Sequence, residues 1–329
     1  MTTKEKERTV LVTGANGRLG HALINKLISE GVNVRAIIQE NRHMVDMPSK
    51  VRLFVGDICD HNVMREAFSG KINTVYHLAA IVSQNKFSRK EIMRVNLEGT
   101  KRIVEESEHC GVGHIIFPSS VDVYGRWRND VLSEESELRP SDAYGQSKAM
   151  AEQFLTNKCG INYTIFRMAA IYGVGFEGSF FKVFSAMTKR KLPIIGDGQN
   201  KLSLVHVNDV VDAFITASKT PKSNNNIYNL SDGKEYTQEY LFQFAASMLN
   251  VPMPRQHINT LVASALTKLI GADADEFRFI TSNRVVDITK IRTELGFKPK
   301  IGIREGGRKL VNEFLDKQDE KEFHVDVGW

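Results

Sequence analysis

A tyrosine and a lysine one helical turn apart, Tyr144 and Lys148, are residue types that could transfer a proton at a carbonyl or hydroxyl carbon. On a helix, positions i and i+4 lie on the same face. A phenol is normally too weak an acid for this role, but a neighbouring ammonium stabilises the phenolate and makes it a usable base. The pair therefore predicts an oxidoreductase with Tyr144 as its acid/base. Such a pair also arises by chance in a chain with eight tyrosines, so its meaning depends on what precedes it.

Two hydroxyl residues, Ser119 and Ser120, end the apolar run at 114–118 upstream of this pair. A side chain at the carboxyl end of a parallel strand points into the crevice where ligands bind. We predict that Ser120 hydrogen-bonds the substrate oxygen. Ser119 is the neighbour that could take this role instead, and strand-end capping is the alternative for both.

A glycine-rich segment, residues 10–20 (VLVTGANGRLG), predicts a nucleotide site near the N-terminus. It follows a predicted strand and opens a predicted helix, which is the context that a phosphate-binding loop requires. Its glycines permit a tight turn and close approach to a pyrophosphate, and the helix N-terminus offers free N–H groups. The residues predicted to bind the cofactor here are Gly14, Asn16, Gly17, Arg18, Leu19 and Gly20.

The elements that must position these residues alternate between strands and helices. Strands are predicted at 9–13, 33–38, 51–55, 74–77, 114–118 and 162–167, and helices at 19–30, 62–69, 89–110 and 143–158. Strands separated by such helices form βαβ units, and hence a parallel sheet with helices on both faces. The sequence predicts an α/β protein with a Rossmann-type doubly wound parallel sheet.

After about residue 173 the pattern becomes mainly helical. Helices are expected at 179–189, 210–218, 237–249, 260–270, 288–295 and 305–316, with strands at 192–195 and 204–207. Asn208 or Asp209 is expected to cap the helix at 210–218, and the charged tail 317–329 to be loosely ordered. We predict a Rossmann domain comprising residues 1–173 plus about 203–220. A smaller, mainly helical substrate lobe is predicted to comprise about 174–202 and 221–329.

The composition is that of an ordinary globular enzyme, with 329 residues, 42% hydrophobic, 25% charged and a net charge of +5. Basic residues are scattered among acidic ones, so nucleic acid is not an expected partner. No apolar run is long enough to span a membrane and the N-terminus lacks a signal-peptide core, so we expect a cytoplasmic protein. The cysteines, at 59, 110 and 159, match no metal-ligand or redox pattern; no metal is expected.

Taken in order, these motifs resemble the extended branch of the short-chain dehydrogenase/reductase superfamily, the NAD(P)-dependent epimerase/dehydratase-like enzymes. The resemblance covers residues 8 to 315 and includes the spacing Gly-x-x-Gly-x-x-Gly. Further motifs that carry it are Val123-Tyr124-Gly125, Ile171-Tyr172-Gly173, Gly196-Asp197-Gly198, residues 205–211 (VHVNDVV) and residues 295–299 (LGFKP). It implies hydride transfer with NAD or NADP as cofactor and a catalytic set of Ser120, Tyr144 and Lys148.

The resemblance also implies a longer cofactor site and a partner. The additional cofactor residues are Asp57, Ile58, Leu78, Ala79, Ala80, Tyr144 and Lys148. Asp57 would contact the adenine amino group, and Lys148 the nicotinamide ribose. His77 and Asn96 are expected to be structural. Many members of the family form homodimers through helices that correspond to 89–110 and 143–158, so a homodimer is expected.

The choice between NAD and NADP stays open. An acidic side chain after the second strand would accept from the adenosine ribose and favour NAD, whereas an arginine would favour the 2′-phosphate of NADP. Glu40 could serve NAD, and Arg42, Arg18 or Arg35 could serve NADP. An ordinary surface role is the alternative for each of them.

Departures from the family pattern bear on the substrate. Nucleotide-sugar enzymes commonly carry Arg-Pro-x-Asn and Arg-Asp-Phe where this chain has residues 167–170 (RMAA) and 202–204 (LSL). A substrate diphosphate needs fixed cations, and Lys182, Lys201 and Arg284 are the remaining candidates. The Val-Asp that follows Ser120 disfavours a 4,6-dehydratase, because dehydratases usually carry Asp-Glu there.

Three hypotheses remain for the function. A nucleotide-sugar epimerase or oxidoreductase is favoured. The second is a reductase or dehydrogenase of a non-nucleotide ketone or alcohol, similar to steroid or flavonoid reductases. The third is a cofactor-binding regulatory protein without catalysis, against which the complete set of Ser120, Tyr144 and Lys148 argues.

Overall fold

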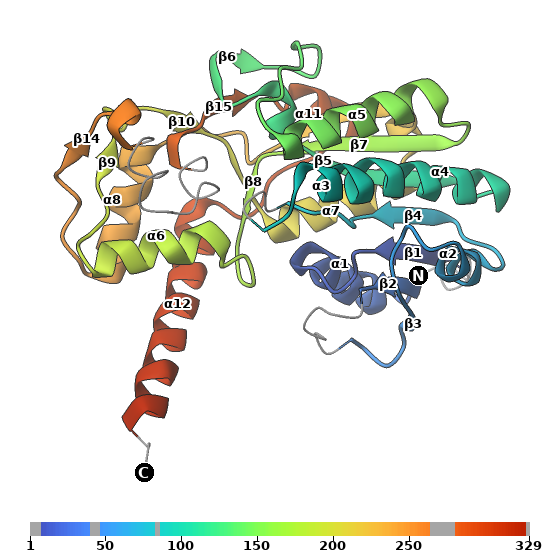
Figure 1. Cartoon of the computed structure of the whole chain (residues 1–329), viewed down its shortest axis with the longest axis horizontal. Helices are drawn as coiled ribbons and strands as arrows, with labels where there is room; N and C mark the ends of the chain where they lie inside the picture. The colour runs from blue at the N-terminus through green and yellow to red at the C-terminus, as the bar shows by residue number, and fades with distance from the viewer. Residues whose placement is uncertain (1–7, 40–46, 83–85, 264–279, 327–329) are drawn as a thin grey trace.

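A seven-stranded parallel sheet forms the centre of the computed structural model, which describes residues 8–39, 47–82, 86–263 and 280–326, the last eight by backbone alone. Its strands are β1 Thr9–Thr13, β2 Asn33–Ile38, β3 Arg52–Val55, β4 Thr74–His77, β5 His114–Ser120, β7 Asn162–Met168 and β12 Asn226–Leu230. They lie in the order β12-β7-β5-β4-β1-β2-β3 (Figure 1). The strand order reverses between β1 and β4, where doubly wound sheets bind their ligands. The predicted Rossmann-type fold is confirmed.

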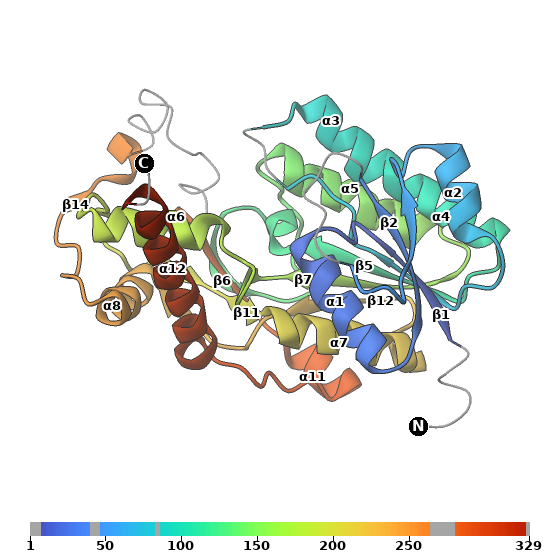
Figure 2. The same cartoon turned by 90° about the horizontal axis from the view of Figure 1, so that it is seen from below.

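Helices cover both faces of this sheet (Figure 2). One face carries α1 Arg18–Ser29, α7 Val207–Lys219 and α11 Thr289–Leu295; the other carries α2 His61–Phe68, α4 Gly99–His109 and α5 Ala143–Lys158. Successive side chains of a strand point to opposite faces. In β1, Val10 and Val12 accordingly pack into the core beneath the first set, and Leu11 into the core beneath the second. The helix predicted at 89–110 is divided into α3 Arg89–Met93, a π-helical turn at Arg94–Glu98 and α4.

A smaller lobe with its own core lies beside the sheet. Its helices are α6 Gly178–Thr188, α8 Gln238–Leu249 and α12 Ile303–Asp326, and α12 extends away from the rest of the molecule (Figure 1). The lobe also holds a small sheet that the sequence did not predict, in the order β13-β10-β15-β6. Its strands are β13 Tyr236–Thr237, β10 Lys201–Leu202, β15 Asn283–Val286 and β6 Trp127–Leu132. Two further pairs join β8 Ala170–Tyr172 to β11 Leu204–His206, and β9 Ile194–Ile195 to β14 His257–Ile258.

Two segments lie on the other side of the expected division between domain and lobe. β12 falls in the range assigned to the substrate lobe, yet it pairs with β7 at the edge of the central sheet. β6 falls in the range assigned to the Rossmann domain, yet it pairs with β15 in the lobe. β12 (NIYNL) begins with the last of three consecutive asparagines and has little apolar pattern, so strand propensity did not reveal it.

The structure corrects the expected cap of α7 and shows how far the last helix extends. The cap of α7 is His206, whose Nδ1 accepts from the backbone N–H of Asn208 at 3.2 Å. Asp209, one of the expected caps, is buried and accepts from the backbone N–H groups of Lys300 and Ile301 at 3.0 and 3.2 Å. The tail 317–329 was expected to be loosely ordered; α12 extends into it as far as Asp326. The helix expected at 260–270 lies outside the described residues after position 263.

Other sequence expectations concern membrane-spanning helices, metal sites and cysteines. Within the described ranges, no helix combines the length and the apolar character needed to cross a bilayer. The same residues contain no cluster of three or more His, Cys, Asp or Glu side chains placed to hold a metal ion. Cys59, Cys110 and Cys159 are all free thiols.

Candidate active site

The glycine loop joins β1 to α1 at the point where the strand order reverses. Gly14 has φ +64°, and a Cβ on it would lie 2.7 Å from the Cα of Ala79 at the end of β4. A Cβ on Gly20 would lie 2.4 Å from the carbonyl oxygen of Gly14, so this glycine lets α1 pack closely against the loop. Gly17 begins α1 without any side-chain cap. The free N–H groups of the first turn, with the positive end of the helix dipole, can therefore receive a phosphate.

We expect Gly14→Ala to abolish the rise in melting temperature that NAD causes in the wild-type protein. The added Cβ must displace the loop from Ala79, and the positive φ adds about 1 kcal/mol of strain. The matched control is Gly31→Ala, because Gly31 also has a positive φ but has nothing within 4 Å of its Cβ position. The control should lose stability and keep the NAD response. A Gly14→Ala protein that responds normally to NAD would contradict this role of the loop.

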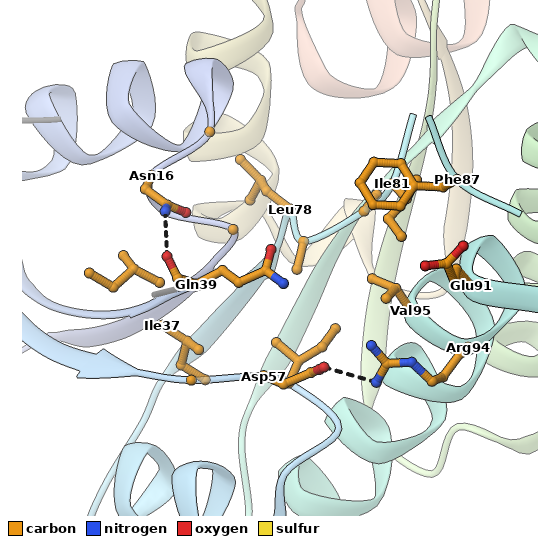
Figure 3. Close-up of a pocket in the computed structure, with 17 residues that line it drawn as sticks. Asn16, Ile37, Gln39, Asp57, Leu78, Ile81, Phe87, Glu91, Arg94 and Val95 are labelled. Atoms are coloured by element: carbon orange, nitrogen blue, oxygen red, sulfur yellow. Dashed lines mark hydrogen bonds and ion pairs between the residues drawn. The ribbon is translucent and has the colours of Figure 1, made fainter. Parts of the chain in front are cut away.

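A cavity of about 400 Å³ extends from the glycine loop along the ends of β2 and β3 (Figure 3). Of the predicted cofactor residues, those that line it are Gly14, Asn16, Gly17, Asp57, Ile58, Leu78, Ala79 and Ala80. Sequence reasoning missed Arg94, whose guanidinium lies 2.8 Å from the Asp57 carboxylate. Burial raises the pKa of Asp57, but the Cys59 backbone N–H and Arg94 outweigh it and hold the pKa below its ordinary value. A charged carboxylate at this end can accept from an adenine amino group.

The structure describes some of the residues that could distinguish NAD from NADP. Glu40 and Arg42 lie outside the described residues. Arg35 is engaged elsewhere, since its guanidinium donates to the carbonyl oxygens of Ala67 and Ser69 at the end of α2. At the end of β2 the carbonyl of Gln39 accepts from the Asn16 side chain at 3.2 Å (Figure 3).

A second, larger cavity of about 1030 Å³ continues from the first and shares part of the glycine loop with it. Its wall includes the predicted residues Arg18, Leu19, Gly20, Ser120, Tyr144 and Lys148. The two cavities together form one elongated space that runs from Asp57, past the open end of α1, to Tyr144. A dinucleotide would fit this space, with its adenine beside Asp57, its phosphates at the start of α1 and its nicotinamide beside Tyr144.

Tyr144 and Lys148 lie on the first turns of α5, beside the end of β5. Asp142 caps the helix by accepting from the backbone N–H of Gly145 at 2.8 Å. A Cβ on Gly145 would lie 2.6 Å from the carbonyl oxygen of Asp122, so the glycine lets this end of α5 approach the turn after β5. The Lys148 ammonium donates to the carbonyl oxygen of Pro118 at 2.7 Å. Ser120, Tyr144 and Lys148 line the same cavity, which brings the three predicted catalytic residues together.

The structure distinguishes the two serines. Ser119 is fully buried, and its hydroxyl donates to the carboxylate of Glu152. Ser120 lines the cavity, accepts from the backbone N–H of Asp122 at 3.1 Å and donates to its carboxylate at 2.9 Å. Both serines line the cavity wall, but the Ser119 hydroxyl is engaged by Glu152, which favours Ser120 as the serine that contacts a ligand.

Burial controls the ionisation of the site. It raises the pKa of Tyr144 well above the ordinary range, the negative charge of Asp122 raises it further, and the neighbouring Ser120 hydroxyl opposes both. Burial lowers the pKa of Lys148 to about 8, against the opposing charge of Glu152. Lys148 is thus largely an ammonium at neutral pH, and it is the cation available to stabilise a phenolate on the same helix face.

His77 and Asn96 are structural, as expected. Burial lowers the pKa of His77 to about 3, so the imidazole is neutral. It bridges the hydroxyls of Thr13 and Thr100 at 2.8 and 3.0 Å. Asn96, in the π-helical turn, donates to Ser147 on α5 at 2.9 Å and also binds both backbone groups of Ile81. Asn96 therefore fixes the loop after β4 against the helix that carries Tyr144.

A third cavity of about 650 Å³ opens between Tyr144 and the lobe. Its wall holds more positive than negative side chains: Arg18, Lys86, Arg126, Lys182 and Arg284 against Asp122 and Asp142. Two of the three cations proposed for a diphosphate, Lys182 and Arg284, are therefore present. The third, Lys201, is not among the lining residues; it is about half exposed and pairs with Glu235 at 2.7 Å.

Comparison with known proteins agrees with this geometry. The model of the NAD dependent epimerase/dehydratase family matches residues 10–231. A UDP-glucose 4-epimerase of Vibrio cholerae is 27% identical over 323 residues, which are 95% of this chain and 97% of that protein. A 3-beta-hydroxysteroid dehydrogenase of Mycolicibacterium neoaurum is 26% identical over a stretch that covers 94% of this chain and 92% of that protein. The UDP-glucose 4-epimerase of Thermotoga maritima, solved with UDP-glucose, has a TM-score of 0.78 at 25% identity, covering 94% of this chain and 99% of that one.

The family match spans the central sheet with the glycine loop, Ser120, Tyr144 and Lys148, and it ends just after β12. Most of the lobe that would hold a substrate lies beyond it. The chain belongs to the NAD dependent epimerase/dehydratase family, the extended short-chain dehydrogenases/reductases, and is an NAD(P)-dependent enzyme of that type.

Proposed function

We propose that the protein oxidises and reduces a hydroxyl-bearing carbon of a nucleotide sugar, with Tyr144 as the acid/base. When bound, NAD(P) accepts the hydride in the oxidised form and donates it in the reduced form. Tyr144 takes the hydroxyl proton as hydride leaves the adjacent carbon and returns it in the reverse direction. Lys148 stabilises the phenolate, and Ser120 hydrogen-bonds the reacting oxygen.

One observation carries this proposal: Ser120, Tyr144 and Lys148, from two separate elements, meet at the end of the elongated cavity that starts at the glycine loop. A dinucleotide whose adenine lies at Asp57 would place its nicotinamide near Tyr144. The hydroxyl-bearing carbon of a substrate bound beside Tyr144 would then lie next to the nicotinamide. A regulatory protein that only binds a cofactor needs no tyrosine beside a buried lysine at this place. The geometry therefore favours catalysis over the non-catalytic alternative.

The charge of the third cavity supports a nucleotide sugar. Five positive and two negative side chains line it, and a diphosphate needs such donors. The relatives named above include two UDP-glucose 4-epimerases, one of them solved with UDP-glucose. We propose that Arg126, Lys182 and Arg284 provide the positive charge that the Arg-Asp-Phe motif provides in other nucleotide-sugar enzymes.

A second candidate function is a reductase or dehydrogenase of a non-nucleotide alcohol or ketone. Leu202, where nucleotide-sugar enzymes carry the arginine of Arg-Asp-Phe, is buried and lines a small apolar cavity of the lobe with Phe180 and Phe184. The match to a hydroxysteroid dehydrogenase over most of both chains supports the same candidate. Phe180 also lines the third cavity, where it could contact an apolar substrate.

The first experiment is a thermal-shift titration with NAD, NADP, UDP-glucose and dTDP-glucose, the sugars added with and without the dinucleotide. A ligand at 100 times its Kd stabilises the folded state by about 2.7 kcal/mol, which is readily measured. We expect a shift with a dinucleotide and an additional shift with a nucleotide sugar. A dinucleotide shift without any sugar shift would reject the nucleotide sugar and leave the second candidate. No dinucleotide shift would reject both.

We also propose a homodimer formed through α3, α4 and α5. Met150 on α5 is 46% exposed, a large apolar side chain on the helix that the family commonly uses for this contact. Sedimentation velocity at micromolar concentration should give about twice the mass of the 37.1 kDa chain. A mass of one chain would contradict the dimer.

A further inference from the structure

An ion pair links the lobe to the catalytic serine. Arg284 of β15 reaches Asp122, in the turn Val121–Tyr124 after β5, with 2.5 Å between guanidinium and carboxylate. The same carboxylate accepts from the Ser120 hydroxyl. Neither residue belongs to the catalytic set. We propose that Asp122 and Arg284 are a positioning pair: Asp122 fixes Ser120 and opposes ionisation of Tyr144, and Arg284 offsets that opposition. This inference rests on the proposed role of Tyr144.

The contacts of Asp122 hold it in one orientation. One carboxylate oxygen receives the Ser120 hydroxyl at 2.9 Å, and the other receives Arg284. The Ser120 oxygen in turn accepts from the Asp122 backbone at 3.1 Å. With its proton committed to Asp122, the Ser120 hydroxyl has a fixed orientation, and its remaining lone pair is left to accept a hydrogen bond.

Arg284 is held as firmly. The nitrogen that meets Asp122 also lies within 3.4 Å of the carbonyl oxygen of Val121 and 3.3 Å of that of Gly125, and the other terminal nitrogen donates to Ser282 at 3.4 Å. Its side chain is only 11% exposed. Arg284 belongs to the lobe, whereas Tyr144 lies on α5, which packs on the central sheet. The pair of Arg284 and Asp122 therefore makes the basicity of Tyr144 depend on the position of the lobe.

The charges that face Tyr144 come from several elements. Asp122 after β5 and Asp142 at the start of α5 are negative, Lys148 is positive, and Arg284 and Arg126 act on Asp122. The other charged side chains that line the cavities around Tyr144 are Arg18, Lys86 and Lys182. Burial raises the pKa of Asp122, but Arg284 outweighs it and holds the pKa below the ordinary value. The carboxylate is therefore ionised at the pH of catalysis. A negative charge disfavours a nearby phenolate, so its removal must lower the pKa of Tyr144.

The test is a pH titration of Tyr144 by NMR in NAD-saturated protein labelled with ¹³C at tyrosine Cζ. The signal that disappears in Tyr144→Phe identifies the residue. Asp122→Asn should lower the midpoint by about one pH unit or more, because one charge at this distance is removed. Arg284→Gln should raise it, because Arg126 alone then faces the carboxylate. Arg284→Lys, which keeps the charge, should titrate like wild type.

A purely structural pair would not move the midpoint in opposite directions. Asp122→Asn with a midpoint equal to or above that of wild type would overturn the proposal, as would Asp122→Asn and Arg284→Gln shifting together. Asp130→Asn is the matched control, since it removes the same charge from an exposed residue. The proposed function is tested by a different measurement. If Tyr144→Phe kept full turnover, the proposed role of Tyr144 would be wrong, whatever the titration shows.

Discussion

Replacing Tyr144 with phenylalanine is expected to reduce turnover by about 10²–10⁴-fold while NAD binding stays intact. The substitution removes one hydroxyl beside Ser120 and leaves the ring in place. The acid/base is lost, whereas the glycine loop and Asp57, at the other end of the cavity, are unchanged. The measurements are kcat with the sugar identified by thermal shift, and the NAD-induced shift itself.

The control for this prediction is Tyr240→Phe. Tyr240 lies on α8 in the lobe, where it stacks on Tyr236 with 5.8 Å between ring centroids. It loses the same hydroxyl without contact to the site, so turnover should stay within twofold of wild type. Equal loss in both variants would point to a general effect on folding. Full turnover in Tyr144→Phe would remove the proposed mechanism.

Replacing Arg167 with methionine is expected to lower the free energy of unfolding by about 3–5 kcal/mol. Arg167 on β7 and Glu152 on α5 form an ion pair at 2.8 Å, with side-chain exposures of 4% and 3%. The guanidinium also donates to the hydroxyl of Tyr124 at 2.9 Å. Without Arg167, the Glu152 carboxylate stays buried with only Ser119 and the charge of Lys148 nearby. Urea unfolding followed by circular dichroism would measure the loss.

Two further variants separate the buried charge from lost packing. In the double variant Arg167→Met with Glu152→Gln no charge remains unpaired, so about half of the lost stability should return. Lys201→Met breaks the exposed pair with Glu235 and should cost less than about 1 kcal/mol. A loss as small for Arg167→Met as for Lys201→Met would show that the buried pair does not hold β7 to α5.

Local patterns were enough to predict much of this site. The glycine loop could be found because its spacing, the strand before it and the helix after it lie within about twenty residues. α5 begins and ends where the sequence predicts, since Asp142 caps it and Tyr144 and Lys148 are one turn apart. Each of these features depends on contacts between near neighbours in the chain.

Contacts between distant segments could not be predicted in this way. Arg94 meets Asp57, and Arg284 meets Asp122 from more than 160 positions away, and no local pattern marks either pair. The edge strand β12 and the lobe strand β6 take their places through pairing with β7 and β15. Asp209 resembles a helix cap in the sequence but instead holds the backbone at Lys300.

The tyrosine and lysine of α5, the serines after 118 and the glycines of the first loop were determined by the sequence itself, because chemistry and spacing within single elements identify them. Only the tertiary structure decided that the Ser119 hydroxyl pairs with Glu152 and that of Ser120 with Asp122. It also decided that Lys182 and Arg284 line the third cavity while Lys201 pairs with Glu235, and that Asp122 lies beside Tyr144. The physical reason is that a residue's partners depend on which face of its element is buried and against what. That is fixed when the sheet and the lobe pack together.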